Sequence, residues 1–224
     1  MKTPGRALLL VGSFKRSRST SFSLGSYLLS NLEHAGVKTS NTYIHSSMKS
    51  EKKQKDLMRL VGESDLIILS CPLYVDSLPY PVIRFMESSA AEVSARKERS
   101  FMAIVNGGFP ESSQSDIAID ICRNYSSEAG FDWAGGLAFG GGGSIDGRPV
   151  ADLPAFMSNV ATALETAAVA LANGDIIPEK AVALARHSAT PKSLYRFFGN
   201  RGWKRKAKKN KVNWRMRARP YADR

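Results

Sequence analysis

Apolar and polar positions follow two kinds of pattern along the first 190 residues. Short, solidly apolar runs predict strands that are buried on both faces, and longer stretches with apolar residues three or four positions apart predict amphipathic helices. We expect strands at residues 6–12, 37–43, 65–71, 100–106 and 131–139. We expect helices at 20–36, 51–62, 81 to the mid-90s, 113–129, 152–173 and 178–187.

This alternation of strands and helices predicts an α/β fold with a doubly wound parallel sheet and helices on both faces. The strand at 37–43 is the more polar one, so we place it nearer an edge. In such sheets a ligand lies beyond the carboxyl ends of the strands, at the topological switch point. The loops expected there are 13–21, 72–79 and 106–111. Four glycines at 140–143 do not lead into a predicted helix at the right distance, and we expect a flexible loop or lid there.

The formal net charge of +12 belongs to one end of the chain. Residues 1–191 hold 19 Lys and Arg against 19 Asp and Glu, whereas residues 192–224 hold 13 Lys and Arg against one Asp. The sequence therefore divides into a neutral domain, 1–190, and a basic, aromatic C-terminal tail, 191–224.

The tail has several competing interpretations. Leu194 and Phe198 are four residues apart and predict a short helix, which Gly199 and Gly202 are expected to end before Trp203. The charge is suited to nucleic acid, an anionic membrane or an acidic partner protein. The aromatic residues favour docking on the domain or on the other subunit of a dimer, because a disordered arm contains few of them.

Other classes of protein are disfavoured by what the sequence lacks. Cys71 and Cys122 have no CxxC partner, and no signal sequence is evident, so we expect a reducing, cytoplasmic location. No apolar run approaches the roughly 20 residues of a membrane span. The three histidines are scattered, which predicts no metal site, and the absence of a GxSxG motif disfavours a hydrolase.

The stretch at 12–21, GSFKRSRSTS, follows the first strand and leads into the first helix. Backbone N–H groups, hydroxyls and the positive end of a helix dipole then meet in one small volume, as a phosphate requires. The Walker A and GxGxxG spacings are not met, because no GK[ST] and no further glycine follow Gly12 in this turn. The alternative is that Ser and Thr only cap the helix. There are more hydroxyls than one cap needs, which favours phosphate binding.

Together, the stretches 12–21, 72–79 (PLYVDSLP) and 106–111 (NGGFPE) resemble the three cofactor loops of the flavodoxin-like NAD(P)H-dependent FMN reductase family. The resemblance covers roughly residues 5–175. It implies a five-stranded sheet in the order 2-1-3-4-5, bound FMN, and usually a homodimer with the flavin near the subunit interface.

The resemblance also implies binding residues. Those implied around the FMN phosphate are Ser13, Arg18, Ser19, Thr20 and Ser21; those near the ring are Pro72, Leu73, Tyr74 and Val75; and those at its other edge are Asn106, Gly107, Gly108 and Phe109. Tyr74 and Phe109 have an alternative role as aromatic anchors of their loops. Lys15 and Arg16 make the first loop more basic than is usual in the family, and they contact the phosphate, a second nucleotide or only solvent.

The resemblance implies an FMN-dependent oxidoreductase that passes hydride from NADH or NADPH to a quinone, azo compound, nitro compound or flavin. Hydride transfer through a flavin requires no acid–base side chain, so we assign no catalytic residue. One alternative is a flavodoxin-like electron carrier without turnover of its own. Another is a non-enzymatic module that presents its basic tail to nucleic acid or membrane.

Overall fold

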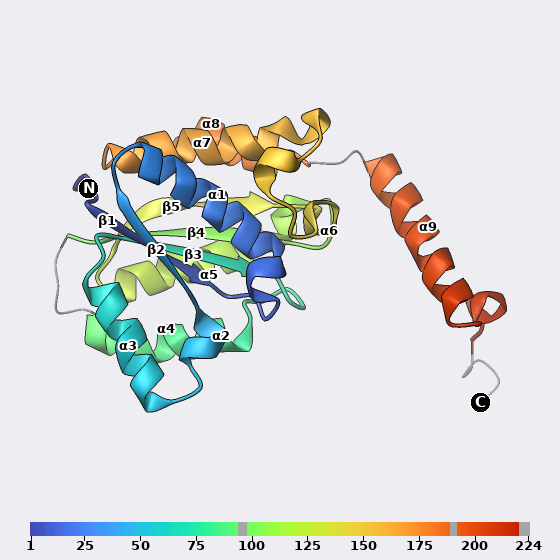
Figure 1. Ribbon diagram of the computed structural model, residues 1–224, viewed down its shortest axis with the longest axis horizontal. Coiled ribbons are helices and arrows are strands. Elements are labelled where there is room, and N and C mark those ends of the chain that lie inside the picture. Colours follow the sequence, from blue (N-terminus) through green and yellow to red (C-terminus); the bar gives the residue numbers. More distant parts are fainter. Residues whose placement is uncertain (94–97, 189–191, 220–224) are drawn as a thin grey trace.

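The computed structural model describes residues 1–93, 98–188 and 192–219. At its centre is a parallel five-stranded sheet in the order β2-β1-β3-β4-β5 (Figure 1). The strands are β1 (Arg6–Val11), β2 (Lys38–Tyr43), β3 (Leu66–Pro72), β4 (Ser100–Asn106) and β5 (Asp132–Phe139). The predicted order is confirmed, and each predicted strand boundary lies within one residue of the observed one.

Side chains along the central strands alternate between two cores. On β1, Leu9 and Val11 belong to the core on one face of the sheet, and Leu8 and Leu10 belong to the core on the other face. This is the two-residue period of a strand with both faces covered, and it explains the solid apolar runs in the sequence. The edge strand β2 is partly exposed, as its polar composition predicted.

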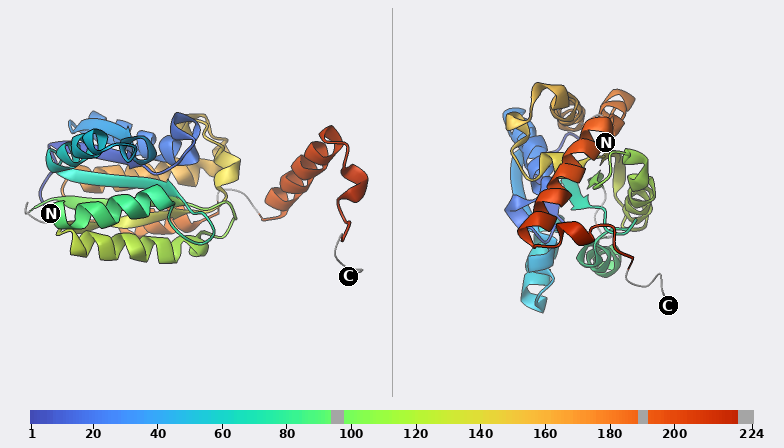
Figure 2. Two further views of the ribbon diagram at one scale, coloured as in Figure 1. Left: turned by 90° about the horizontal axis from the view of Figure 1, so that it is seen from below. Right: turned by 90° about the vertical axis from the view of Figure 1, so that its right-hand side faces the viewer.

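Helices cover both faces of the sheet (Figures 1 and 2). One face carries α1 (Thr20–His34), α7 (Ser158–Ala172) and α8 (Glu179–Arg186). The other carries α2 (Ile44–Ser47), α3 (Glu51–Gly62), α4 (Tyr80–Val93) and α5 (Asp116–Glu128). The short helix α2 was not predicted, and α5 is preceded by a 3-10 turn, η2 (Ser112–Ser115), where the sequence predicted α-helix.

The helix predicted from residue 152 begins only at Ser158. Two 3-10 turns, η3 (Val150–Asp152) and η4 (Ala155–Met157), precede it. Pro154 explains the delay, because a proline disfavours helical dihedrals in the residue before it, and Leu153 is extended.

Length and composition alone would allow the stretch Ala155–Ala172 to cross a membrane, so the expectation that no stretch approaches a span is wrong on that criterion. In the structure most of this stretch is α7, which packs against α1 and α8. Val160, Leu164 and Leu171 are buried in the core on that face. The apolar composition is therefore that of a core helix.

The C-terminal helix α9 runs without a break from Lys192 to Lys209, so the predicted interruption at Gly199 and Gly202 is wrong. Each glycine costs about 1 kcal/mol in a helix, and the many Lys and Arg residues around them are good helix formers. A 3-10 turn, η5 (Asn213–Arg215), follows. The boundary expected at 190–191 lies outside the described residues.

Helix α9 stands away from the sheet and its covering helices (Figures 1 and 2). The hydroxyl of Tyr195, near its start, donates a hydrogen bond to the carbonyl of Gly108. Farther along, Trp203 and Trp214 are 67% and 72% exposed, so the predicted docking of the tail aromatics on the domain is wrong for these two. Docking on a second subunit stays a prediction.

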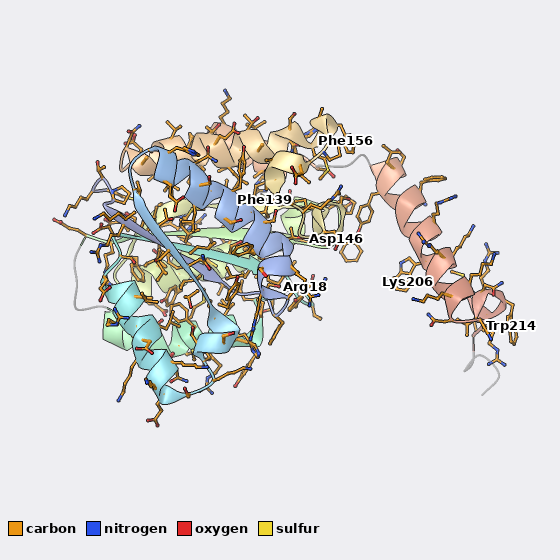
Figure 3. All side chains as sticks on the ribbon, in the orientation of Figure 1. Arg18, Phe139, Asp146, Phe156, Lys206 and Trp214 are labelled. Atoms are coloured by element: carbon orange, nitrogen blue, oxygen red, sulfur yellow. The ribbon has the colours of Figure 1, made fainter. Side chains whose placement is uncertain are left out.

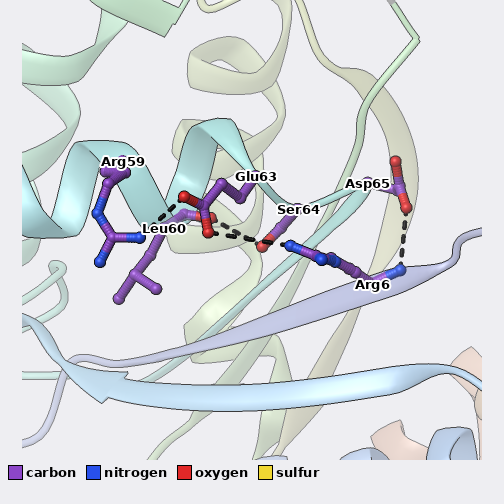
Figure 4. A network of polar contacts seen from close by, with 6 residues as sticks. All are labelled: Arg6, Arg59, Leu60, Glu63, Ser64 and Asp65. Atoms are coloured by element: carbon purple, nitrogen blue, oxygen red, sulfur yellow. Dashed lines mark hydrogen bonds and ion pairs between the residues drawn. The ribbon is translucent and has the colours of Figure 1, made fainter.

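A polar network holds the amino ends of β1 and β3 together (Figure 4). Asp65 accepts hydrogen bonds from the N–H groups of Gly5 and Arg6, both at 2.9 Å. Glu63 pairs with Arg59 at 2.8 Å and with Arg6 at 3.9 Å. These charges lie at the opposite end of the strands from the loops considered next, so we assign them a structural role.

Candidate functional site

The loops that follow β1, β3, β4 and β5 meet at the carboxyl edge of the sheet and enclose a cavity of about 340 Å³. Its lining residues are Ser13, Lys15, Ser19, Thr20, Ser21, Pro72, Leu73, Tyr74, Asn106, Gly107, Gly108, Gly142, Gly143 and Asp146. Ten of the thirteen residues named from the sequence are among them. The topology therefore brings the three predicted loops together in one site.

The first loop leaves β1 through a position that only glycine can occupy. A Cβ on Gly12 would lie 2.6 Å from Cβ of Cys71 and 2.6 Å from a methyl carbon of Val82. The N–H of Gly12 donates to the carbonyl of Ser70 at 2.8 Å. The chain then forms the 3-10 turn η1 (Arg16–Arg18), with Arg16 in the left-handed region at φ 51°, and enters α1.

Three hydroxyls of this loop have defined structural roles. Ser19 is the N-cap of α1, and its side chain accepts from the N–H of Phe22 at 3.0 Å. Thr20 donates to the carbonyl of Gly142 at 2.9 Å, and Ser21 donates to Oδ1 of Asn106 at 2.7 Å. Capping thus explains the Ser19 hydroxyl. The hydroxyls of Thr20 and Ser21 join the first loop to the glycine run after β5 and to Asn106 at the end of β4.

The backbone at the start of α1 keeps donors that the protein does not use. Within the described part of the chain, the N–H groups of Thr20 and Ser21 have no hydrogen-bond acceptor. Both residues line the cavity. Free N–H groups at the start of a helix, together with the positive end of its dipole, form a site for an anion such as a phosphate.

The glycine run after β5 is part of the site, not a free loop or lid as expected. The N–H of Gly142 donates to the carbonyl of Gly107 at 2.8 Å, and the N–H of Gly141 donates to that of Phe109 at 2.6 Å. A short helix, α6 (Gly142–Ile145), follows. A Cβ on Gly147 would lie 2.5 Å from the carbonyl oxygen of Arg18, so this segment also packs against the first loop.

Three of the predicted residues do not line the cavity. Val75 is 98% exposed, because Val75 and Asp76 both have positive φ and form the tip of a tight turn closed by two hydrogen bonds between Tyr74 and Ser77. Phe109 is 61% exposed. Arg18 is exposed at the same end of the sheet as Asp146 (Figure 3).

No protein-family model matches the chain, and no curated protein matches it in sequence. Solved structures do match it. An NADH:FMN oxidoreductase has a TM-score of 0.55 at 16% identity, covering 84% of this chain and 97% of its own. A Bacillus anthracis azoreductase has a TM-score of 0.52 at 12% identity, and the match covers 75% of this chain and 98% of the azoreductase. A Streptococcus flavodoxin has a TM-score of 0.51 at 16% identity, and the match covers 75% of this chain and 97% of the flavodoxin. The fold is flavodoxin-like.

In this flavodoxin-like site, Lys15 and Asp146 are the charged residues among those lining the cavity. Lys15 is exposed and belongs to the same loop as the free N–H groups, so its charge adds to that of the helix dipole. Asp146 belongs to the segment after β5 and has a positive φ of 48°. In the sequence, this segment is marked by the four glycines at 140–143, which on their own predicted a loop outside the site.

The buried cysteines contribute no nucleophile. Cys71 lies near the end of β3, and burial raises the pKa of its thiol well above the ordinary value, with a smaller contribution from Cys122. Burial raises the pKa of Cys122 to about 12. Both thiols are therefore protonated at neutral pH, and among the described residues no group of three or more His, Cys, Asp or Glu could hold a metal ion.

Proposed function

We propose that the chain binds FMN in this cavity and passes hydride from NADH or NADPH to a small acceptor such as a quinone, an azo compound, a nitro compound or a flavin. The observation that carries the proposal is the pair of unused N–H groups of Thr20 and Ser21 at the start of α1. Both residues line a cavity whose size lies within the roughly 300–1,000 Å³ usual for small-molecule sites.

The residues present fit the phosphate of FMN. A phosphate at the start of α1 would accept hydrogen bonds from the N–H groups of Thr20 and Ser21, with the Lys15 ammonium nearby. The hydroxyls of Thr20 and Ser21 are already bonded to the neighbouring loops, so the backbone donors are held in place before any ligand arrives.

The other loops fit a flat, polar-edged ring. Pro72, Leu73 and Tyr74 offer an apolar wall, and glycines at 107, 108, 142 and 143 allow close approach of the backbone. The N–H groups of Gly108 and Gly143 have no acceptor in the part of the chain that the structure describes. They are donors for the polar edge of an isoalloxazine ring.

When bound, FMN supplies the hydride chemistry itself. The chain's part is to hold the phosphate, to orient the ring against the Pro72 loop and to leave the other side open to nicotinamide and acceptor in turn. No residue is required to move a proton at the nicotinamide.

The comparisons support this proposal through the fold alone. An azoreductase and an NADH:FMN oxidoreductase have similar folds, with TM-scores of 0.52 and 0.55 at 12% and 16% identity. Three further points are our proposals for this chain: that NADH or NADPH is the hydride donor, that a small molecule of the classes above is the acceptor, and that the chain forms a homodimer.

The test is the visible spectrum of the purified protein, followed by titration with FMN and with riboflavin. We expect flavin absorbance or quenching of added FMN fluorescence, with FMN bound more tightly than riboflavin. Anaerobic NADH and NADPH should then bleach the bound flavin. A colourless protein that quenches no added FMN would refute the proposal.

An electron carrier is the second candidate, because the cavity and its donors serve it equally and a flavodoxin shares the fold. Bound FMN that neither nicotinamide bleaches, but that a chemical reductant does, would favour this function over the reductase.

A further inference from the structure

The C-terminal segment formed by α9 and η5 concentrates charge beyond what the flavin site uses. Residues 192–219 contain 12 Lys and Arg and no Asp or Glu. Among the described residues, no carboxylate lies within ion-pairing distance of the lysines and arginines between 201 and 217. The ion pairs that the described residues form join side chains of the neutral domain. The segment therefore presents positive charge without internal compensation.

This charge covers one broad side of the helix. When each residue turns about 100°, six cations fall within an arc of about 200° around the axis: Arg201, Lys204, Arg205, Lys206, Lys208 and Lys209. The apolar side chains are distributed: Leu194 and Trp203 are nine residues apart, about two and a half turns, and so lie on opposite sides. A helix that lies on a membrane needs one continuous apolar face, and α9 has none.

Trp203 and Trp214 each lie beside a cation of this segment; Lys206 and Trp214 are labelled in Figure 3. The ammonium of Lys206 lies 5.6 Å from the centre of the Trp203 ring, and the guanidinium carbon of Arg215 lies 4.3 Å from the centre of the Trp214 ring. Both indoles are otherwise largely exposed. Exposed aromatic rings interleaved with cations are the arrangement that binds unpaired bases and their phosphates together.

We propose that α9 and η5 bind single-stranded nucleic acid. The lysines and arginines contact phosphates, and Trp203 and Trp214 stack on bases. An acidic partner protein would match the charge but would leave two exposed indoles without a defined role. A duplex would match the charge but would offer stacked, paired bases that the indoles cannot reach.

The length of the helix sets the scale of the site. Its 18 residues span about 27 Å, long enough to lie along several nucleotides of a single strand. The salt slope is the slope of the logarithm of the association constant against the logarithm of the salt concentration, and each phosphate contact on a single strand contributes about 0.7 to it. Removing three contacts should therefore lower the salt slope by about 2, and the affinity by about 100-fold at about 0.1 M salt.

The experiment is the fluorescence anisotropy of a labelled oligodeoxythymidine mixed with the full-length protein over a range of salt concentrations. The test variant is Lys204→Gln/Lys208→Gln/Lys209→Gln, in which glutamine keeps good helix propensity. The matched control is Lys52→Gln/Lys53→Gln/Lys55→Gln, the same charge change on exposed residues of α3. We expect the test variant to lose about 100-fold in affinity with a shallower slope, and the control to bind as the wild type does.

A second variant tests stacking. Trp203→Ala/Trp214→Ala should lower the affinity by about 5- to 150-fold per stacked base without changing the salt slope. The proposal is overturned if the wild type does not bind at low salt, if both lysine variants weaken binding equally, or if a duplex binds as tightly as the single strand. It is also overturned if vesicles of equal phosphatidylserine and phosphatidylcholine displace the oligonucleotide. None of these readouts depends on FMN.

Discussion

Replacing Gly140 with alanine is expected to separate two loops of the site. A Cβ there would lie 2.1 Å from the carbonyl oxygen of Pro110 and 3.1 Å from that of Phe109. Both are backbone atoms that no side-chain rotation can move, so the segment after β5 must shift. The shift would break the hydrogen bonds from Gly141 to Phe109 and from Gly142 to Gly107.

At about 0.5–1.5 kcal/mol for each hydrogen bond, the loss is about 1–3 kcal/mol in the free energy of unfolding. For a chain of this size, the melting temperature falls by about 2–4 °C for each kcal/mol. The same shift moves four cavity-lining glycines apart, so the affinity for FMN should fall together with the stability.

Gly143→Ala is the matched control within the same glycine run. Nothing lies within 4 Å of a Cβ at Gly143, and its φ is not in the left-handed region. Alanine should therefore raise the stability of this helical position by about 0.5–1 kcal/mol. Thermal unfolding followed by circular dichroism measures both variants. A Gly140→Ala protein that melts with the wild type, or two variants that fall equally, would refute this account of the loop.

Three further predictions concern the same site and the core. Lys15→Gln should lower the affinity for FMN about 2- to 5-fold at low salt and leave the affinity for riboflavin unchanged. Arg18→Gln, outside the cavity, should change the affinity for FMN less, and fluorescence titration of both variants measures the difference. Ser21→Ala should cost about 1–3 kcal/mol in urea unfolding, because it leaves Asn106 Oδ1 without its donor, and a double-mutant cycle with Asn106→Ala should reveal the coupling. Burial raises the pKa of both thiols, to about 12 for Cys122, so each keeps its proton in the folded state where the unfolded thiol ionises. Stability should therefore fall above about pH 9 by about 1.4 kcal/mol per pH unit for each thiol, and Cys122→Ala should remove one of the two contributions.

The candidate site shows why a phosphate turn and a helix cap need not be alternatives. The Ser19 hydroxyl caps α1 by binding one N–H group, and two other N–H groups of the first turn have no acceptor among the described residues. A helix start leaves several N–H groups unpaired, so one cap does not use them all. The cap fixes the helix start, and the remaining donors are the ones available to an anion.

The sequence by itself determined the parts of the fold that depend on local pattern. The apolar runs of β1, β3 and β4 were visible because both faces of these strands are buried. Their alternation with helices led to a parallel sheet and to the loops at its carboxyl edge, and the resemblance added the order of the strands. The resemblance also implied the binding residues, ten of which line the cavity, although Val75 at the tip of the second loop does not.

Only the tertiary structure decided which distant segments complete the site. Thr20 bonds to Gly142 across 122 positions of sequence, and Ser21 bonds to Asn106 across 85. The local sequence of a glycine run does not show which segments it contacts. The run fits this site because backbone atoms of other loops pack in the space that a Cβ would occupy. Local pattern fixes where elements form, and close packing between remote segments fixes what those elements build together.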